Sequence, residues 1–321
     1  MSVESFTEKR SAADSAWSIL LAASAMADAV EQQGRHAGFG SDEHAQLHPL
    51  PADHPDTVIA WHPESGWQSC LSPDDPRSAM LDLYLPVCGT TAHPVTVGHL
   101  GQSLDGFIAT HSGDSQFVTG HDNLVHLHRM RGLCGAVVVG AGTVAADDPQ
   151  LTTRFVAGPN PLRVVFDPAR RLAATYRVFT DEAAPTLYVC GRSRIAAGET
   201  HVGSAVVVGV DDAGPEHDMA QVLSLLRARG YPRVFVEGGG ITVSAFLEAN
   251  LLDRLQIAIA PLLIGDGRPA IRLAPHASLR DCRRPRYRVF LMGGDVLFDC
   301  ELNAQADAEQ ATRTPPVRRI I

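Results

Sequence analysis

Two short apolar runs, each closed by glycine, limit what this chain can fold into. They are residues 136–140 (AVVVG) and 233–238 (RVFVEG), and neither alternates apolar with polar side chains. A strand without alternation is buried on both faces, which occurs where helices cover both sides of a mostly parallel sheet. The sequence therefore predicts the α/β class.

Residues 94–302 alternate strand patterns with helix patterns. Strands are expected at 94–100, 136–139, 162–166, 186–190, 233–236 and 254–260, and helices at 122–131, 219–229 and 243–249. Residues 287–292 and 295–302 flank Gly293-Gly294, a spacing that predicts an antiparallel hairpin with a primed turn. We expect a mostly parallel sheet with helices on both faces and this hairpin at its C-terminal end.

Residues 1–93 have a different character and predict a small N-terminal extension before the main domain at 94–302. Residues 16–30 predict a buried amphipathic helix, and the stretch rich in His, Pro and Asp that follows predicts loops with one short strand at 57–61. This region holds 13 of the 36 acidic and 4 of the 27 basic residues, so the remainder is neutral. Neutrality without a basic stripe argues against nucleic acid as the main partner. Residues 303–321 are expected to form a flexible tail.

Several chemistries and locations are excluded by what the sequence lacks. No apolar run reaches the ~18 residues of a membrane helix, and residues 16–30 lack the basic flank of a signal peptide. The six cysteines form no CxxC pair, which is typical of reduced thiols in a cytoplasmic protein. Lys9 is the only lysine, so the main domain has no Schiff-base or P-loop lysine. HExxH, the zinc-deaminase motif and GxSxG are all absent, and no metal site is expected.

Two glycine-rich turns follow the two buried strands. Gly140 opens GAGT at 140–143, and Gly238 opens a run of three glycines before the next helix. Glycine lets a backbone approach a phosphate closely, and a helix N-terminus favours an anion. The pattern is not GxGxxG and lacks the acidic ribose clamp of a Rossmann unit. Because three glycines forfeit local stability for no packing gain visible in the sequence, a dinucleotide held between two strands is favoured over two ordinary crossover turns.

Arg131 and Arg154 flank the Asp-Asp-Pro segment at 147–149. Asp-Asp-Pro is a common turn, and a lone arginine is usually a solvated surface charge. Two guanidinium groups close to one site would instead suit a phosphorylated substrate.

The order of these motifs resembles the reductase domain of bacterial riboflavin biosynthesis, in the dihydrofolate reductase-like superfamily. The motifs are SLDG at 103–106, SGDSQ at 112–116, Arg131, VGAGTVAADDPQLTTR at 139–154, VEGG at 236–239 and LLDRLQIAIAPLLIGDG at 251–267. The resemblance extends over residues 93–302 and implies NADPH-dependent reduction of a 5-amino-6-(5-phosphoribosylamino)uracil-type substrate, with hydride going to C1′ of the ring-opened ribosylamine. It also implies a homodimer formed near the C-terminal hairpin.

The resemblance implies a set of site residues as well. Contacts to the substrate and its phosphate fall at Ser115, Arg131, Leu151, Arg154 and Glu237. Contacts to NADPH fall at Gly101, Phe117, Gly140, Thr143, Asp147, Gly238, Gly239, Gly240, Ile241, Thr242, Val243 and Ser244. Pro168, Arg170 and Arg171 lie where the 2′-phosphate of NADPH is expected, which favours NADPH over NADH.

The chain departs from this family in three places. Residues 1–93 lack the zinc motif and are too short for a deaminase domain, so deaminase activity is not expected. His99 stands where the family usually has a lysine, and Phe117 where it commonly has a tryptophan. His99 or Glu237 could act as the general acid toward the ribosylamine nitrogen. The alternative is that His99 is a neutral strand histidine, hydrogen-bonded to backbone.

Two other functions remain open. One is a reductase of a pterin or another imine in specialised metabolism, which His99 and the unusual N-terminal region favour and the two arginines oppose. The other is a non-catalytic nucleotide-binding module, which the complete set of cofactor-type glycines with Thr143 opposes.

Overall fold

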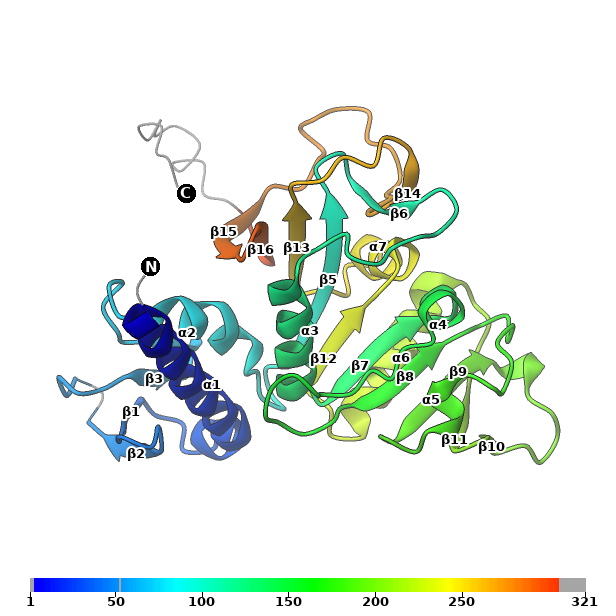
Figure 1. Cartoon of the computed structure of the whole chain (residues 1–321). Coiled ribbons are helices and arrows are strands. Elements are labelled where there is room, and N and C mark those ends of the chain that lie inside the picture. Colours follow the sequence, from blue (N-terminus) through cyan, green and yellow to red (C-terminus); the bar gives the residue numbers. More distant parts are fainter. Residues whose placement is uncertain (1–2, 52, 306–321) are drawn as a thin grey trace.

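In the computed structural model, which describes residues 3–51 and 53–305, a ten-stranded sheet organises the chain (Figure 1). Its strands are β5 (Val95–Ser103), β7 (Ala136–Gly140), β8 (Leu162–Phe166), β9 (Thr186–Gly191), β10 (His201–Val202), β11 (Ala205–Val210), β12 (Arg233–Glu237), β13 (Arg254–Ala260), β15 (Pro285–Met292) and β16 (Asp295–Gln305). Their order is β10-β11-β9-β8-β7-β12-β5-β13-β16-β15. The strands from β11 to β13 are parallel, whereas β10, β16 and β15 pair antiparallel. The predicted mostly parallel sheet and C-terminal hairpin are confirmed.

Helices cover both faces of this sheet, as expected. They are α3 (His121–Leu133), α4 (Ala141–Asp147), α5 (Arg177–Thr180), α6 (Pro215–Ala228) and α7 (Gly240–Glu248). On β7, Val138 packs with α6 and α7 in one apolar cluster, while Val137 and Val139 join the cluster on the opposite face. Both faces of the strand are thus buried, which explains why its sequence contains no polar residue. Two further strands, β6 (Phe107–Thr110) and β14 (Gly267–Pro269), pair with each other beside the main sheet.

The N-terminal region contains more regular structure than expected. Its elements are α1 (Val3–Glu31), β1 (Ala37–Ser41), β2 (Leu47–Leu50), β3 (Ile59–His62), β4 (Gly66–Ser69), α2 (Ser78–Tyr84) and a 3₁₀ turn (Leu85–Val87). The helix predicted at 16–30 is confirmed within α1, but the prediction of loops with a single strand is wrong, because an antiparallel sheet forms in the order β2-β1-β3-β4. Its strands are short and contain glycine and proline, so their local signal is weak. Tertiary packing stabilises them instead, since Trp67 contacts both Phe39 and Trp61, with ring centroids 5.6 and 5.3 Å apart.

This N-terminal region packs directly on the main sheet. Trp17 in α1 donates its indole N–H to the carbonyl of Ala157 at 2.8 Å, and the Tyr84 hydroxyl lies 2.7 Å from Nδ1 of His126 in α3. Apolar side chains of α1, α2, β1, β3 and the main sheet form one continuous cluster. Figure 1 shows α1 and the small sheet on the side of the main sheet where α3 lies. Residues 1–93 therefore share a core with the domain that follows them.

The last strand of the chain is longer than predicted. β16 continues to Gln305, three residues beyond the predicted strand, and the expected flexible tail lies otherwise outside the described residues. Among the described helices, none has the length and apolar content needed to cross a membrane.

Candidate active site

The two glycine turns meet at the carboxyl ends of β7 and β12, which are adjacent parallel strands. Gly140 precedes α4 and Gly239 precedes α7, so each turn leads directly into a helix. The hydroxyl of Thr143 accepts a hydrogen bond from the backbone N–H of Gly239 at 2.9 Å, which ties one turn to the other. The carboxyl edge of a parallel sheet is where α/β proteins place their ligand sites. The structure thus brings together two motifs that are almost 100 residues apart in the sequence.

Close packing, and not only ligand access, accounts for these glycines. A Cβ on Gly140 would lie 2.2 Å from Oγ1 of Thr242, and one on Gly240 would lie 1.9 Å from the carbonyl oxygen of Ala270. Gly238 has φ of +103° and leaves no room for a side chain beside Thr143. The expectation that the glycine run brings no packing gain is therefore wrong. The neighbours that exclude a Cβ are distant in sequence, so the sequence alone could not reveal them.

A buried ion pair joins two of the predicted substrate contacts. Arg131, near the end of α3, donates from Nε to Oε2 of Glu237 at 2.9 Å, and its Nη2 bonds the other carboxylate oxygen. Its Nη1 donates to the backbone carbonyl of Thr152 at 3.2 Å. The exposed fractions of the two side chains are 6% and 11%. Arg131 therefore fixes the position of the Glu237 carboxylate at the end of β12.

A second arginine lies beside this pair in a group of positive charges. Arg154 donates from Nη1 to the hydroxyl of Thr152 at 2.7 Å, and its backbone N–H donates to Nδ1 of His128 at 2.8 Å. Burial lowers the pKa of Arg154, and the positive charges of Arg131 and Arg177 lower it further. Burial likewise lowers the pKa of His128 to about 4, with Arg131 and Arg154 adding to the shift. His128 therefore stays neutral near pH 7 and can accept the hydrogen bond from Arg154.

Arg177, Thr152 and His128 belong to this site, although sequence reasoning did not select them for it. Arg177 is held by Asp148, which accepts its backbone N–H at 2.8 Å and lies 3.5 Å from its Nε. Asp148 has φ of +39° at the end of α4. Arg177 sits in the four-residue helix α5, and nothing in its local pattern distinguishes it from the chain's other arginines.

Ser115 and Asp147 also lie close to each other and form a weak hydrogen bond. The Ser115 hydroxyl lies 3.5 Å from Oδ1 of Asp147. Burial raises the pKa of Asp147, the hydrogen bond from Ser115 opposes that shift, and the negative charge of Glu237 adds to it. Predicted substrate and cofactor contacts therefore share one electrostatic environment. Leu151, by contrast, is 1% exposed with φ of +55°, so its side chain belongs to the core.

The residues predicted to contact the cofactor along α7 fall into two groups. Ile241 is 86% exposed at the first turn of the helix, while Thr242 is buried against Gly140. Val243 is fully buried in the core, and the hydroxyl of Ser244 accepts the backbone N–H of Arg272 at 2.8 Å. Only the first turn of α7 thus presents side chains to the carboxyl edge.

The turn that follows β8 begins at Pro168 and contains Arg170 and Arg171. Their guanidinium groups differ in how accessible they are to an anion. Asp167, which is fully buried, accepts the backbone N–H of Arg171 at 2.6 Å and so fixes the turn. Arg170 has φ of +52°, and its guanidinium is engaged by both carboxylate oxygens of Glu199. The side chain of Arg171 is 74% exposed. Its Nε lies 3.9 Å from Oδ1 of Asp167, a longer contact than those between Arg170 and Glu199, so Arg171 is the more accessible of the two to an incoming anion.

His99 lies in the core beneath α3, and the residue is only 3% exposed. Neither ring nitrogen has a hydrogen-bond partner among the described residues, and the ring of His126 packs 5.0 Å away. Burial lowers its pKa well below the usual value, and His126 adds to this shift. Gly101, two residues later, leaves space for the methyl group of Thr119. The catalytic role of His99 stays a prediction. Its burial favours a neutral structural histidine, but the backbone hydrogen bond expected for that alternative is not present among the described residues.

The sheet and its polar carboxyl edge define a dihydrofolate reductase-like α/β domain. The chain belongs to the family described as the RibD C-terminal domain, whose model matches residues 95–286. Within the described residues, no group of three or more His, Cys, Asp or Glu side chains is placed to hold a metal ion.

Similar proteins carry names from riboflavin biosynthesis. A 2,5-diamino-6-ribosylamino-4(3H)-pyrimidinone 5′-phosphate reductase of Methanothermobacter thermautotrophicus is 34% identical over 214 residues, which cover 64% of this chain and 97% of that protein. The riboflavin biosynthesis protein RibD of Bacillus amyloliquefaciens is 34% identical over 177 residues, or 54% of this chain and 47% of that one.

A solved structure supports the same assignment. It is a diaminohydroxyphosphoribosylaminopyrimidine deaminase/5-amino-6-(5-phosphoribosylamino)uracil reductase from Thermotoga maritima, with 26% identity and a TM-score of 0.57. The match covers 70% of this chain and 60% of that protein. The rest of the Thermotoga protein lies outside the match.

Proposed function

We propose that this protein is a nicotinamide-dependent reductase of a 5-phosphoribosylamino-pyrimidine, as the names of its relatives suggest. The observation that carries the proposal is the grouping of Arg131, Arg154 and Arg177 beside Glu237 at the end of β12. Guanidinium groups suit a phosphate, and a carboxylate fixed by Arg131 suits the polar groups of a pyrimidine or ribityl chain. A ligand that combines both features fits this edge of the sheet.

The residues at the two glycine turns fit a nicotinamide dinucleotide. A Cβ on Gly142 would meet no atom within 4 Å, so this part of the first turn is open. Phe117 and Ile241 leave large apolar side chains 91% and 86% exposed, which a bound ring system would cover. The N-terminus of α7 would face the pyrophosphate, and Arg171 would contact the 2′-phosphate of NADPH. The cofactor would supply the hydride that reduces C1′ of the ribosylamine.

The protein's own groups would then align the substrate. Arg154 and Arg177 would hold its phosphate, because Arg131 is already occupied by Glu237 and Thr152. Holding this remote group converts binding energy into alignment of the reacting carbon. Glu237 would orient the substrate at the end of β12. Removal of either the substrate phosphate or the guanidinium groups that hold it should therefore raise KM more than it lowers kcat.

Loss of NADPH absorbance tests this proposal directly. The substrates to compare are 2,5-diamino-6-ribosylamino-4(3H)-pyrimidinone 5′-phosphate, its uracil counterpart in which oxygen replaces the 2-amino group, and both compounds without phosphate. We expect turnover of at least one phosphorylated compound, with a lower kcat/KM when the phosphate is removed. Arg154→Gln should raise KM about tenfold, whereas the exposed Arg229→Gln should leave it unchanged. No NADPH oxidation with either pyrimidine, or equal kcat/KM without phosphate, would contradict the proposal.

The two other functions left open by the sequence are less well supported. A pterin or simple imine without a phosphate gives no reason for Arg154 and Arg177 to lie close to each other at this edge. A non-catalytic module would bind NADPH without oxidising it, which the same assay distinguishes. The six cysteines are all free thiols, in keeping with a cytoplasmic location.

A homodimer is also part of the proposal. On the outer face of β15, Tyr287, Val289 and Leu291 are 63%, 39% and 54% exposed, and they adjoin Val296 and Phe298 of β16. A second copy of the chain would cover this apolar face. Leu291→Glu should then convert a dimer into a monomer by light scattering during size-exclusion chromatography. A wild-type chain that elutes as a monomer at micromolar concentration would contradict the dimer.

A further inference from the structure

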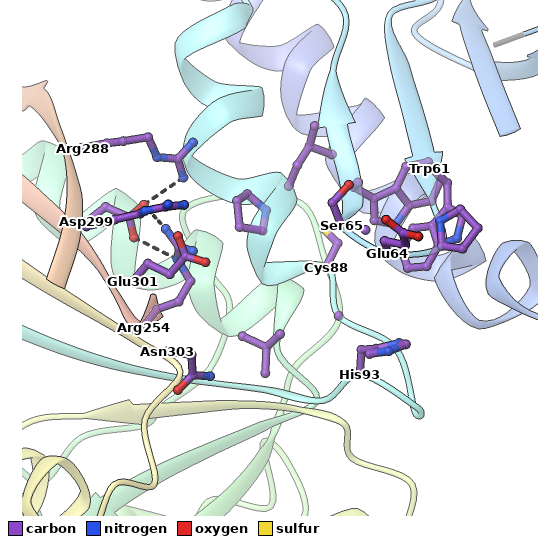
Figure 2. Close-up of a pocket in the computed structure, with 18 of the residues that line it drawn as sticks. Trp61, Glu64, Ser65, Cys88, His93, Arg254, Arg288, Asp299, Glu301 and Asn303 are labelled. Atoms are coloured by element: carbon purple, nitrogen blue, oxygen red, sulfur yellow. Dashed lines mark hydrogen bonds and ion pairs between the residues drawn. The ribbon is translucent and has the colours of Figure 1, made fainter. Parts of the chain in front are cut away.

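A cavity of about 820 Å³ lies between the N-terminal region and the C-terminal hairpin (Figure 2). Its lining includes Val95 and Arg254, which begin β5 and β13. The glycine turns of the candidate active site follow the opposite, carboxyl ends of the parallel strands. β5 has nine residues and spans roughly 26 Å at the usual rise of a strand. The cavity is therefore a different site from the one described above, and its volume suits a small molecule.

One wall of this cavity contains two guanidinium groups that share a single buried carboxylate. Asp299 accepts hydrogen bonds from Nε and Nη2 of Arg254 at 3.2 and 2.6 Å, and from Nη2 of Arg288 at 2.9 Å. Gln256 donates to the same carboxylate at 3.3 Å. Asp299 is fully buried, whereas the side chain of Arg288 is 41% exposed. Two guanidinium groups share one carboxylate, so Arg288 keeps N–H donors and positive charge for a ligand (Figure 2).

The opposite wall is aromatic and includes buried donors without acceptors. Trp61 and Trp67 line the cavity, with ring centroids 5.3 Å apart and an angle of 71° between their planes. They are 3% and 5% exposed, and neither indole N–H has a hydrogen-bond partner among the described residues. Both nitrogens are themselves buried, so this wall presents the small exposed parts of the indole rings to the cavity.

Two acidic side chains of the lining restrict the ligand further. Glu64 lies on the side of the tryptophans and Glu301 on the side of the arginines (Figure 2). Their carboxylates can accept N–H groups, so a bare hydrocarbon ring or a simple polyanion would fit poorly. A heterocycle that offers both N–H donors and acceptors is complementary to this wall.

We propose that the cavity binds a small molecule that combines a planar heteroaromatic ring with an anionic group. The ring lies against the side of Trp61 and Trp67, and the anion binds Arg288. Flavin, purine and pyrimidine nucleotides share this chemistry. The site is independent of the proposed reductase activity, because it lies at the other end of the strands and uses none of the same residues.

Tryptophan fluorescence gives a direct test, since Trp61 and Trp67 are two of the three tryptophans in the chain. The probes are flavin mononucleotide, adenosine 5′-monophosphate and orotidine 5′-monophosphate, each titrated into the full chain with saturating NADP⁺ present. We expect saturable quenching by at least one of them. Riboflavin, adenosine or orotidine, which lack the phosphate, should bind about tenfold more weakly than the matching nucleotide.

Variants show which site is responsible. Arg288→Gln should weaken the quenching ligand about tenfold, while Arg154→Gln in the candidate active site should not change its affinity. Circular dichroism checks that Arg288→Gln is folded, and the half-exposed position of this side chain favours that. The proposal is overturned if no probe gives saturable quenching below about 1 mM. It is also overturned if Arg288→Gln binds as tightly as the wild type, or if removal of the phosphate makes no difference.

Discussion

Arg131 and Glu237 join the end of α3 to the end of β12 through a buried ion pair, with Nε 2.9 Å from Oε2. The two residues are 106 positions apart, and each is almost completely removed from solvent. Removing one partner of such a pair leaves an uncompensated charge in the interior. The pair therefore ties the stability of the fold to the geometry of the candidate active site.

Arg131→Leu should lower the free energy of unfolding by about 3–5 kcal/mol, because the Glu237 carboxylate would remain buried without its partner. The double variant Arg131→Leu/Glu237→Leu should recover a substantial part of this loss, since it removes both charges. Urea denaturation of the wild type, both single variants and the double variant gives the coupling energy. Strictly additive effects would show that the two side chains do not depend on each other.

Gly240 and Gly142 offer a matched comparison at the two turns. Gly240→Ala should destabilise the fold by more than about 1 kcal/mol, because its Cβ would lie 1.9 Å from the Ala270 carbonyl oxygen. Gly142→Ala places a Cβ in open space within α4 and should be neutral or stabilise by about 0.5–1 kcal/mol. Thermal or urea unfolding measures both changes. Equal destabilisation by the two substitutions would refute the packing explanation.

Arg171 and Arg170 should differ in their effect on cofactor preference. Arg171→Gln is expected to lower the ratio of kcat/KM for NADPH over NADH about tenfold, since its guanidinium is largely exposed and is paired with Asp167 only at 3.9 Å, which leaves N–H donors for the 2′-phosphate. Arg170→Gln should change that ratio less, because Glu199 already engages the Arg170 side chain. Steady-state kinetics with both cofactors decides the matter. A larger change for Arg170→Gln would place the 2′-phosphate at the other arginine.

Acid should destabilise the fold through its buried histidines. Burial lowers the pKa of His126 to about 3, whereas an unfolded histidine has a pKa near 6.5. Between these values the unfolded chain binds more protons, so the free energy of unfolding falls as the pH falls below about 6.5. His126 alone should contribute a loss of about 1 kcal/mol between pH 7 and pH 5.5. His99, whose pKa is also lowered, should add to the same slope.

Urea denaturation at several pH values between 5.5 and 7.5 measures this slope. His126→Gln should flatten it even if the variant is less stable at every pH, while replacing the exposed His111 with Gln should leave it unchanged. A slope that is the same in both variants would mean that His126 does not remain neutral in the folded chain.

The sequence predicted the parallel sheet, the hairpin and the core strands well, because residues 136–140 and 287–302 carry strong local patterns. It missed β1, β2 and β4, because the packing of Phe39, Trp61 and Trp67 that holds the small sheet together arises only in the folded chain. The resemblance selected residues that the structure gathers at one edge, such as Thr143 and Glu237. Arg177 could not be found in this way, because its position near Arg154 arises only when the folded chain brings it to Asp148 at the end of α4.

The hydrogen bond from Trp17 to the Ala157 carbonyl, described above as a packing contact, has a consequence for how the chain can be divided. Because α1 buries apolar surface of the main sheet, cutting the chain before Pro94 would expose that surface and make the remaining piece prone to aggregate. Melting should accordingly proceed as one cooperative transition and not as two. In this chain, α1 and the small N-terminal sheet therefore belong to the same folding unit as the main sheet, and a truncated or transplanted domain should include them.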